Sequence, residues 1–116
     1  MSDTTQAKVI AISSDVMGRG DVDLGRVLMR SYLHTLTEVD PRPDVVVFFN
    51  NGVRLAVADS PAVDDLQAIA ARGTRLLLCG TCLNAFELRD QVAVGEISNM
   101  YAISETMLQA ATVINL

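Results

Sequence analysis

Short apolar runs alternate with helix-like segments along this chain, and this alternation limits the possible folds more than any other feature. The runs occupy residues 8–12, 44–49, 74–78 and 112–114. Each has the length of a strand, and the second combines β-branched with aromatic residues, as strands do. Because helices separate the strands and the connections are short, parallel pairing with right-handed crossovers is expected. The sequence therefore predicts an α/β fold.

The segments between these runs carry helical periodicity. Apolar side chains recur at spacings of three and four from residue 22 to residue 39, behind Asp21 as a helix-capping residue. Shorter helices are expected after the second and third runs and over residues 98–110. Residues 53–57 are expected to form a short extended piece, and residues 89–97 an irregular link. The periodic apolar positions of the first helix are Leu24, Val27, Leu28, Tyr32, Leu33 and Leu36.

Length and charge narrow the class of protein. The chain has 116 residues, enough for one domain with a single core, and we expect residues 8–116 to form it behind a flexible segment of residues 1–7. Its formal net charge is −5 and its basic residues are scattered, so no nucleic acid partner is expected. No apolar run reaches the roughly 18 residues that cross a bilayer, and the N-terminus lacks a signal pattern. We expect a cytoplasmic protein with no membrane contact.

The sequence Cys79-Gly80-Thr81-Cys82 holds both cysteines of the chain. It follows the third apolar run, so both sulfurs are expected at the carboxyl end of a central strand, where parallel sheets bind ligands. Cytoplasmic thiols stay reduced, which favours a catalytic, redox or metal-binding pair over a structural disulfide. With His34 as the one histidine, a four-ligand zinc site would need ligands shared between chains. No metal or other cofactor is expected.

The chemistry of this pair allows two interpretations. Thiolate is the nucleophilic form of cysteine, and a helix N-terminus favours it, so the pair can act as a sulfur nucleophile or acceptor. Alternatively, both side chains are small hydrophobes that only pack, because free cysteine is among the most buried residue types. The position of the pair at a strand end favours the functional interpretation.

Polar residues follow the first two apolar runs at the same predicted edge. Ser14 and Asp15 follow the first run, and Asn50 ends the second. We expect them to line one pocket with the cysteines, although Asn is also common in turns because it tolerates left-handed geometry. The segment Gly18-Arg19-Gly20 lacks the third glycine and the lysine of a phosphate loop, so it predicts a tight turn.

Two motifs resemble a known family. The segment Ser13-Ser14-Asp15-Val16-Met17-Gly18-Arg19-Gly20-Asp21, combined with Cys79-Gly80-Thr81-Cys82-Leu83-Asn84, is similar to the DsrE-like domain of YedF-type proteins. The resemblance covers essentially the whole chain. It implies a three-layer sandwich with a mostly parallel, flavodoxin-like sheet of about five strands and helices on both faces. It also implies a homo-oligomer and a place in sulfur or selenium metabolism.

The resemblance further implies a relay chemistry. Family members in sulfur relay accept sulfane sulfur as a cysteine persulfide and hand it to a partner protein, and the relay cysteine matches Cys79. Two features depart from the pattern. Many DsrE-like proteins have an arginine where this chain has Phe86, and YedF-type proteins usually carry a TusA-like domain ahead of this one. The expected partner is therefore a separate sulfur donor or acceptor such as a TusA-like protein.

The function expected from these features is that of a sulfurtransferase or sulfur carrier, with the persulfide on Cys79 and with Cys82 as a resolving or auxiliary thiol. Gly80 and Thr81 would supply backbone N–H groups and a helix cap. The alternative is a non-catalytic module that binds a small ligand or a protein and whose cysteines merely pack. The residues expected to contact the substrate are Ser14, Asp15, Asn50, Gly80, Thr81 and Asn84.

Overall fold

The computed structural model describes residues 7–116, in which five strands form one sheet. All four strand pairings are parallel, and the strand order is β4-β3-β2-β1-β5. This confirms the predicted α/β fold and the parallel sheet. The expected flexible segment lies, apart from Ala7, outside the described residues. The strands are β1 (Lys8–Ile12), β2 (Val45–Phe48), β3 (Arg75–Cys79), β4 (Glu96–Ser98) and β5 (Thr112–Asn115).

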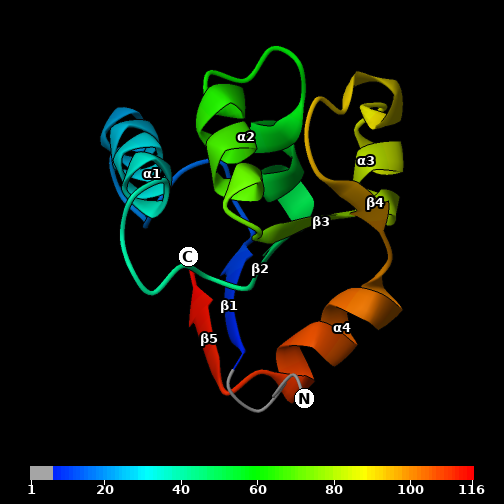
Figure 1. Ribbon diagram of the computed structural model, residues 1–116. Coiled ribbons are helices and arrows are strands. Elements are labelled where there is room, and N and C mark those ends of the chain that lie inside the picture. The colour runs from blue at the N-terminus through cyan, green and yellow to red at the C-terminus, as the bar shows by residue number, and fades with distance from the viewer. Residues whose placement is uncertain (1–6) are drawn as a thin grey trace.

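Helices cover both faces of the sheet, as the resemblance implied. Figure 1 shows α4 on the opposite side of the sheet from α1 and α2. The helices are α1 (Val22–Leu36), α2 (Val63–Ala71), α3 (Gly80–Ala85) and α4 (Met100–Gln109), and the 3₁₀ segments are η2 (Asn50–Ala56) and η3 (Arg89–Gln91). None of the helices among residues 7–116 is both long enough and apolar enough to cross a membrane.

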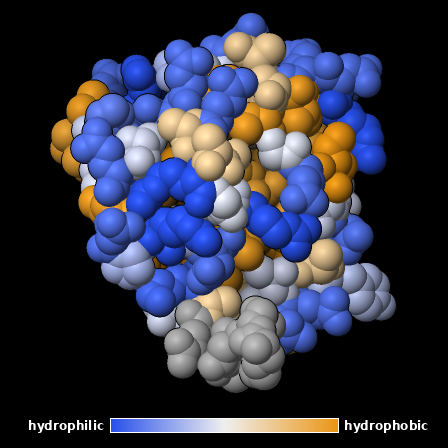
Figure 2. Space-filling view, in the orientation of Figure 1, coloured by the Kyte–Doolittle hydropathy of each residue, from blue (hydrophilic) through white to orange (hydrophobic). Residues whose placement is uncertain are grey.

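Helix α1 lies where the periodicity predicts it, and Leu33 and Leu36 are buried as expected, but its first two turns present a different face to the core. Leu24, Val27 and Leu28 are exposed, and Figure 2 shows apolar residues at the surface over this helix. Gly25 sets the orientation, because its carbonyl accepts a hydrogen bond from the Met17 N–H (3.0 Å) and the loop after β1 packs directly on it. The buried positions are Gly25, Met29, Leu33 and Leu36.

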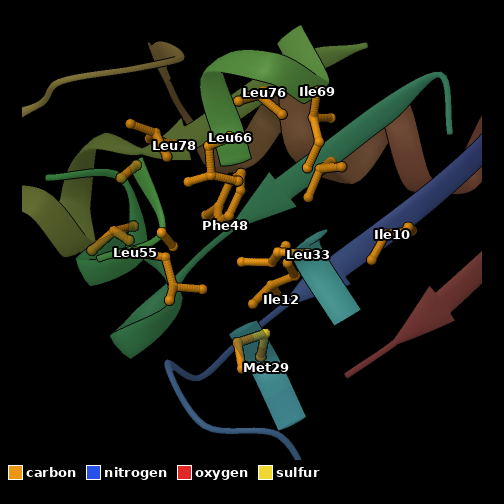
Figure 3. Packing of buried hydrophobic residues seen from close by; sticks show 14 of the residues in the cluster. Ile10, Ile12, Met29, Leu33, Phe48, Leu55, Leu66, Ile69, Leu76 and Leu78 are labelled. Atoms are coloured by element: carbon orange, nitrogen blue, oxygen red, sulfur yellow. The ribbon is translucent and has the colours of Figure 1, made fainter. Parts of the chain in front are cut away.

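The larger part of the core lies between the sheet and the layer formed by α1, α2 and η2. Alternate strand residues point to this side, since successive side chains of a strand face opposite ways. Figure 3 shows Leu33 beside Ile12, and Leu66 over Phe48. Each large side chain buried in this way stabilises the fold by about 2–3 kcal/mol.

The opposite face carries a smaller core under α4 alone. Ile103 is fully buried there, and it packs in one cluster with Val47, Leu77 and Cys79 of the central strands. Cys79 points to this face because it alternates with Leu78, which belongs to the larger core. The first of the two cysteines is therefore part of the packing beneath α4.

Residues 53–57 are not extended, contrary to expectation, because most of them continue the 3₁₀ segment η2. Asn50 turns the chain with a φ of 51°, and the Gly52 N–H donates to the Phe49 carbonyl at 3.0 Å. A Cβ atom at Gly52 would overlap the carbonyl oxygen of Ile12. Only glycine, which has no Cβ atom, allows this close contact between η2 and the end of β1.

The link expected over residues 89–97 also contains regular structure. It includes η3 and the start of the edge strand β4, whose three residues pair with Leu77, Leu78 and Cys79 of β3. Gly95 precedes β4 with a φ of 93°, a left-handed conformation that other residues rarely adopt. Three residues are too few to establish the alternation by which a strand is recognised in a sequence.

The close contact at Gly52 gives a stability prediction. We expect Gly52→Ala to lower the free energy of unfolding by about 2–3 kcal/mol, because the new methyl group must displace backbone rather than a flexible side chain. Urea denaturation followed by circular dichroism measures the change. Gly18→Ala is the control, since Gly18 has a positive φ but no atom near its Cβ position. A loss no greater than that of the control would show that the contact is not tight.

Candidate functional site

Cys79 and Cys82 lie at the carboxyl end of β3, which is flanked by β4 and β2 in the sheet. Cys79 is the last residue of the strand and the residue before α3, and only 1% of its surface is exposed. Cys82 is half-buried in the first turn of α3 and packs against both core clusters. Both are free thiols. The sulfur nearer the solvent is therefore that of Cys82.

The sulfur of Cys82 accepts a hydrogen bond from the backbone N–H of Asn50 at 3.0 Å. Asn50 can direct its N–H to this sulfur because it adopts a left-handed conformation at the start of η2. Thus the structure brings together Asn50 and the cysteine pair, residues 32 positions apart in the sequence. The contact uses the backbone of Asn50, whereas the sequence analysis considered its side-chain amide.

The surroundings of Cys82 favour its neutral form. Burial raises the pKa of the Cys82 thiol, and the Asn50 N–H acts in the opposite direction. The neighbouring Cys79 raises this pKa further through a hydrogen bond and through the negative charge of its thiolate form. Cys82 therefore stays protonated at neutral pH, and its S–H can donate to an acceptor beside it. The two cysteines have different environments and different chemistry.

Two of the predicted pocket residues lie apart from this contact. The Ser14 hydroxyl accepts from the Val16 N–H at 3.1 Å and so fixes the turn after β1. Asp15 is half-buried and lines a cavity against α1 and η2. Among the hydrogen bonds of residues 7–116, none joins Ser14 or Asp15 to a cysteine.

Gly80 and Thr81 begin α3, so their N–H groups are among those that a helix leaves unpaired at its start. Gly80 is buried, and a Cβ atom there would lie 3.0 Å from the Ser98 carbonyl oxygen. Thr81 is exposed. The expectation that Gly80 and Thr81 supply the cap is wrong, because Cys79 occupies the capping position and no side chain caps this helix.

Two arginines flank α3 from other parts of the chain. The Arg89 Nη1 donates a hydrogen bond to the Asn84 Oδ1 at 3.2 Å, so the side chain of Asn84 contacts Arg89 and not the thiols. The guanidinium of Arg54 lies 4.2 Å from the ring centroid of Phe86, and its Nε donates to the Asn51 Oδ1 at 2.9 Å. Neither arginine was predicted from the sequence. An aromatic residue at position 86 could have suggested a stacked cation, but not its origin.

Metal binding finds no support in the described part of the chain. Residues 7–116 contain no cluster of three or more histidine, cysteine or acidic side chains that could hold a metal ion.

Comparisons with known proteins agree with this architecture. The sequence matches the DsrE/DsrF-like family over residues 8–116. Among curated proteins, none matches it significantly.

Two solved structures resemble the whole chain. The ychN protein from E. coli superposes with a TM-score of 0.74 at 17% sequence identity, covering 96% of this chain and 99% of that one. MTH1491 from Methanobacterium thermoautotrophicum, a protein of unknown function, gives 0.70 at 21% identity, with coverage of 96% and 99%. At these identities the likeness shows the fold alone.

The unequal environments of the thiols predict unequal alkylation. We expect iodoacetamide to modify Cys82 before Cys79, since Cys79 is almost fully buried. The rate at Cys82 should keep rising above the pH at which an ordinary thiol is fully ionised, because its pKa is raised. Mass spectrometry of the fragmented peptide measures each site.

The variant Cys79→Ala tests the cause of this raised pKa. It removes the neighbouring thiol that helps to raise the pKa of Cys82, so Cys82 should react faster at neutral pH. An unchanged rate would mean that Cys79 does not influence Cys82.

Proposed function

Because the chain belongs to the DsrE/DsrF-like family, we propose that it is a sulfurtransferase or sulfur carrier that holds sulfane sulfur as a persulfide on Cys79. The observation that carries this proposal is the position of the two thiols. They are the only cysteines of the sequence, and they lie together at the carboxyl end of β3. Members of this family work in sulfur relay, which supports a role for a thiol pair at this place.

The loading step needs a donor that contains a sulfur–sulfur bond. The Cys79 thiolate attacks the terminal sulfur of a persulfide donor, one S–S bond forms, the S–S bond of the donor breaks, and the donor leaves as a thiolate. Because Cys79 is buried, a small donor such as inorganic polysulfide is favoured over a bulky one unless α3 moves. In that case the leaving group is the polysulfide shortened by one sulfur atom, which is hydrosulfide when the donor contains two sulfur atoms.

Cys82 offers a route for release. Its thiolate can attack the Cys79 sulfur, which forms a Cys79–Cys82 disulfide and expels hydrosulfide, and an external thiol then reduces the disulfide. Alternatively, an acceptor thiolate attacks the outer sulfur and leaves Cys79 as a thiol. The raised pKa of Cys82 favours the second route at neutral pH, because little Cys82 thiolate is present.

Donors around the pair can hold an anionic sulfur. The Asn50 N–H already points at the Cys82 sulfur, and the N–H groups of Gly80 and Thr81 begin α3 beside Cys79. Arg54 and Arg89 add positive charge on either side of this helix. We assign further substrate contacts at this edge to Ser14, Asp15 and Asn84.

The partner that we propose is a separate TusA-like protein, following the YedF-type resemblance, and the proposed relay operates in the cytoplasm, where thiols stay reduced. We also propose that the protein forms a homo-oligomer. Tyr101 and Leu108 on α4 are 87% and 85% exposed, and they support this proposal because contact between two copies of the chain would remove these apolar side chains from water. A light-scattering mass equal to one chain would contradict it.

One observation favours the alternative function, a binding module without sulfur chemistry. Cys79 is 1% exposed and belongs to the apolar cluster beneath α4, as expected of a cysteine that only packs. The two functions differ in whether Cys79 accepts sulfur, so one loading experiment distinguishes them.

Incubation with inorganic polysulfide tests the proposal. We expect the intact mass to rise by about 32 Da, the mass of one sulfur atom, and dithiothreitol to reverse the gain because persulfides are reducible. The gain should disappear in Cys79→Ser and persist in Cys82→Ser. At alkaline pH, where Cys82 ionises, loading of Cys82→Ser should last longer than that of the natural sequence, since the internal release route is gone.

The controls separate loading from loss of fold. Both serine variants should keep the circular dichroism spectrum of the natural sequence, since each replaces one sulfur by oxygen. No gain of mass in a folded protein would support the binding module, and a gain that requires Cys82 instead of Cys79 would overturn the assignment of the carrier.

A further inference from the structure

A cavity lies between α1, the loop after β1, η2 and the start of α2. Its volume is about 470 Å³, within the range that small-molecule sites occupy. It lies on the side of the sheet opposite α4, because α1, α2 and η2 all pack on that side. The persulfide chemistry proposed for Cys79 uses two lining residues of this cavity, Asp15 and Arg54.

Positive charge lines this cavity although the whole chain is acidic. Arg26 and Arg30 reach it from α1, Arg54 reaches it from η2, and Asp15 is the one carboxylate among its described lining residues. The lining thus carries a formal charge of +2, from three arginines and one aspartate, whereas the chain carries −5. Such a local excess favours an anion in the cavity.

Two of these guanidinium groups are not neutralised by a neighbour. Arg26 pairs with Asp23 at 3.6 Å, but within residues 7–116 neither Arg30 nor Arg54 has a carboxylate oxygen within 4.0 Å. Arg54 is held in place by Asn51 and by the ring of Phe86, and these contacts leave its two Nη groups free to donate. A guanidinium already fixed in position costs less to order when a ligand binds.

The remaining wall of the cavity is apolar. Val27 is 61% exposed on α1 and faces this space, while Leu55 and Ala62 form buried surface beneath it. Pro61 completes this wall at the start of α2. An apolar wall beside free guanidinium groups matches a ligand with an apolar body and an acidic end, not a bare inorganic ion.

Asp15 limits the charge that such a ligand can carry. Its carboxylate faces the same cavity and would repel a second negative group. A compound with a single acidic group therefore fits better than a polyanion.

We propose that this cavity binds a small organic anion, whose carboxylate, sulfonate or phosphate group lies between Arg30 and Arg54 and whose apolar body lies against Val27 and Leu55. Neither Cys79 nor Cys82 lines this cavity, and the site would exist whether or not Cys79 accepts sulfur.

Fluorescence titration with 8-anilino-1-naphthalenesulfonate tests this proposal, because the probe combines an apolar body with one sulfonate. We expect one saturable site per chain. Arg30→Gln and Arg54→Gln should each weaken binding about tenfold, the usual effect of losing one charge-assisted hydrogen bond. Arg42→Gln is the matched control, since Arg42 is paired with Asp44 away from the cavity, and it should leave the affinity unchanged.

Further probes test the two halves of the site. The neutral analogue N-phenyl-1-naphthylamine should bind at least tenfold more weakly, and inorganic sulfate at millimolar concentration should compete poorly. Val27→Asp, at an exposed position that is expected to tolerate the change, should abolish binding by placing a second carboxylate in the cavity. Amide NMR shifts should change at Val27 and Leu55, not at Leu108 on α4.

The opposite results would overturn the proposal. The two arginine variants would then bind the probe as tightly as the natural sequence does, or the neutral analogue would bind as tightly as the sulfonate. Effective competition by sulfate, or amide shifts confined to α4, would also contradict the proposal. Cys79→Ser separates this proposal from the sulfur function, because it should load no sulfur yet keep its full affinity for the probe.

Discussion

The parallel pairing of β1, β2 and β3 is the constraint on which the rest of the structure depends. It brings the carboxyl ends of three strands to one edge, and there the segment after β2 meets the helix after β3. Gly52 lets η2 lie directly against the end of β1, and Asn50 then directs its N–H to the sulfur of Cys82. Thus a backbone contact open only to glycine helps to determine the surroundings of a thiol on a different element.

This arrangement makes the two cysteines unequal. Cys79 is packed beneath α4, and Cys82 lies nearer the solvent with a raised pKa. Burial shields a sulfur on Cys79 from water, which suits a carrier, but it also restricts which donors and acceptors reach that sulfur. The neutral Cys82 thiol beside it can donate a hydrogen bond to an anionic sulfur. The proposed function needs this division of roles.

The sequence predicted the fold more fully than it predicted the candidate site. Strands β1, β2 and β3 are apolar runs with clear ends, so their positions and parallel pairing follow from pattern. The buried face of α1 followed from pattern only at Leu33 and Leu36, because the contact of Gly25 with the preceding loop turns Leu24 and Leu28 to the solvent. The position of Arg54 was not predicted either, for a similar reason. Its place over Phe86 is a tertiary contact between distant segments, and no local pattern encodes it.

The central claim is that Cys79 passes its sulfur to another protein, and single-turnover transfer tests this most directly. The protein is loaded with ³⁵S-labelled polysulfide, freed of excess donor and mixed with a TusA-like protein that has one reactive thiol. Sulfur relay through Cys79 predicts that the label moves to the acceptor from the natural sequence and from Cys82→Ser, and that Cys79→Ser transfers none. Label that stays on the loaded protein, or equal transfer from Cys79→Ser, would contradict it.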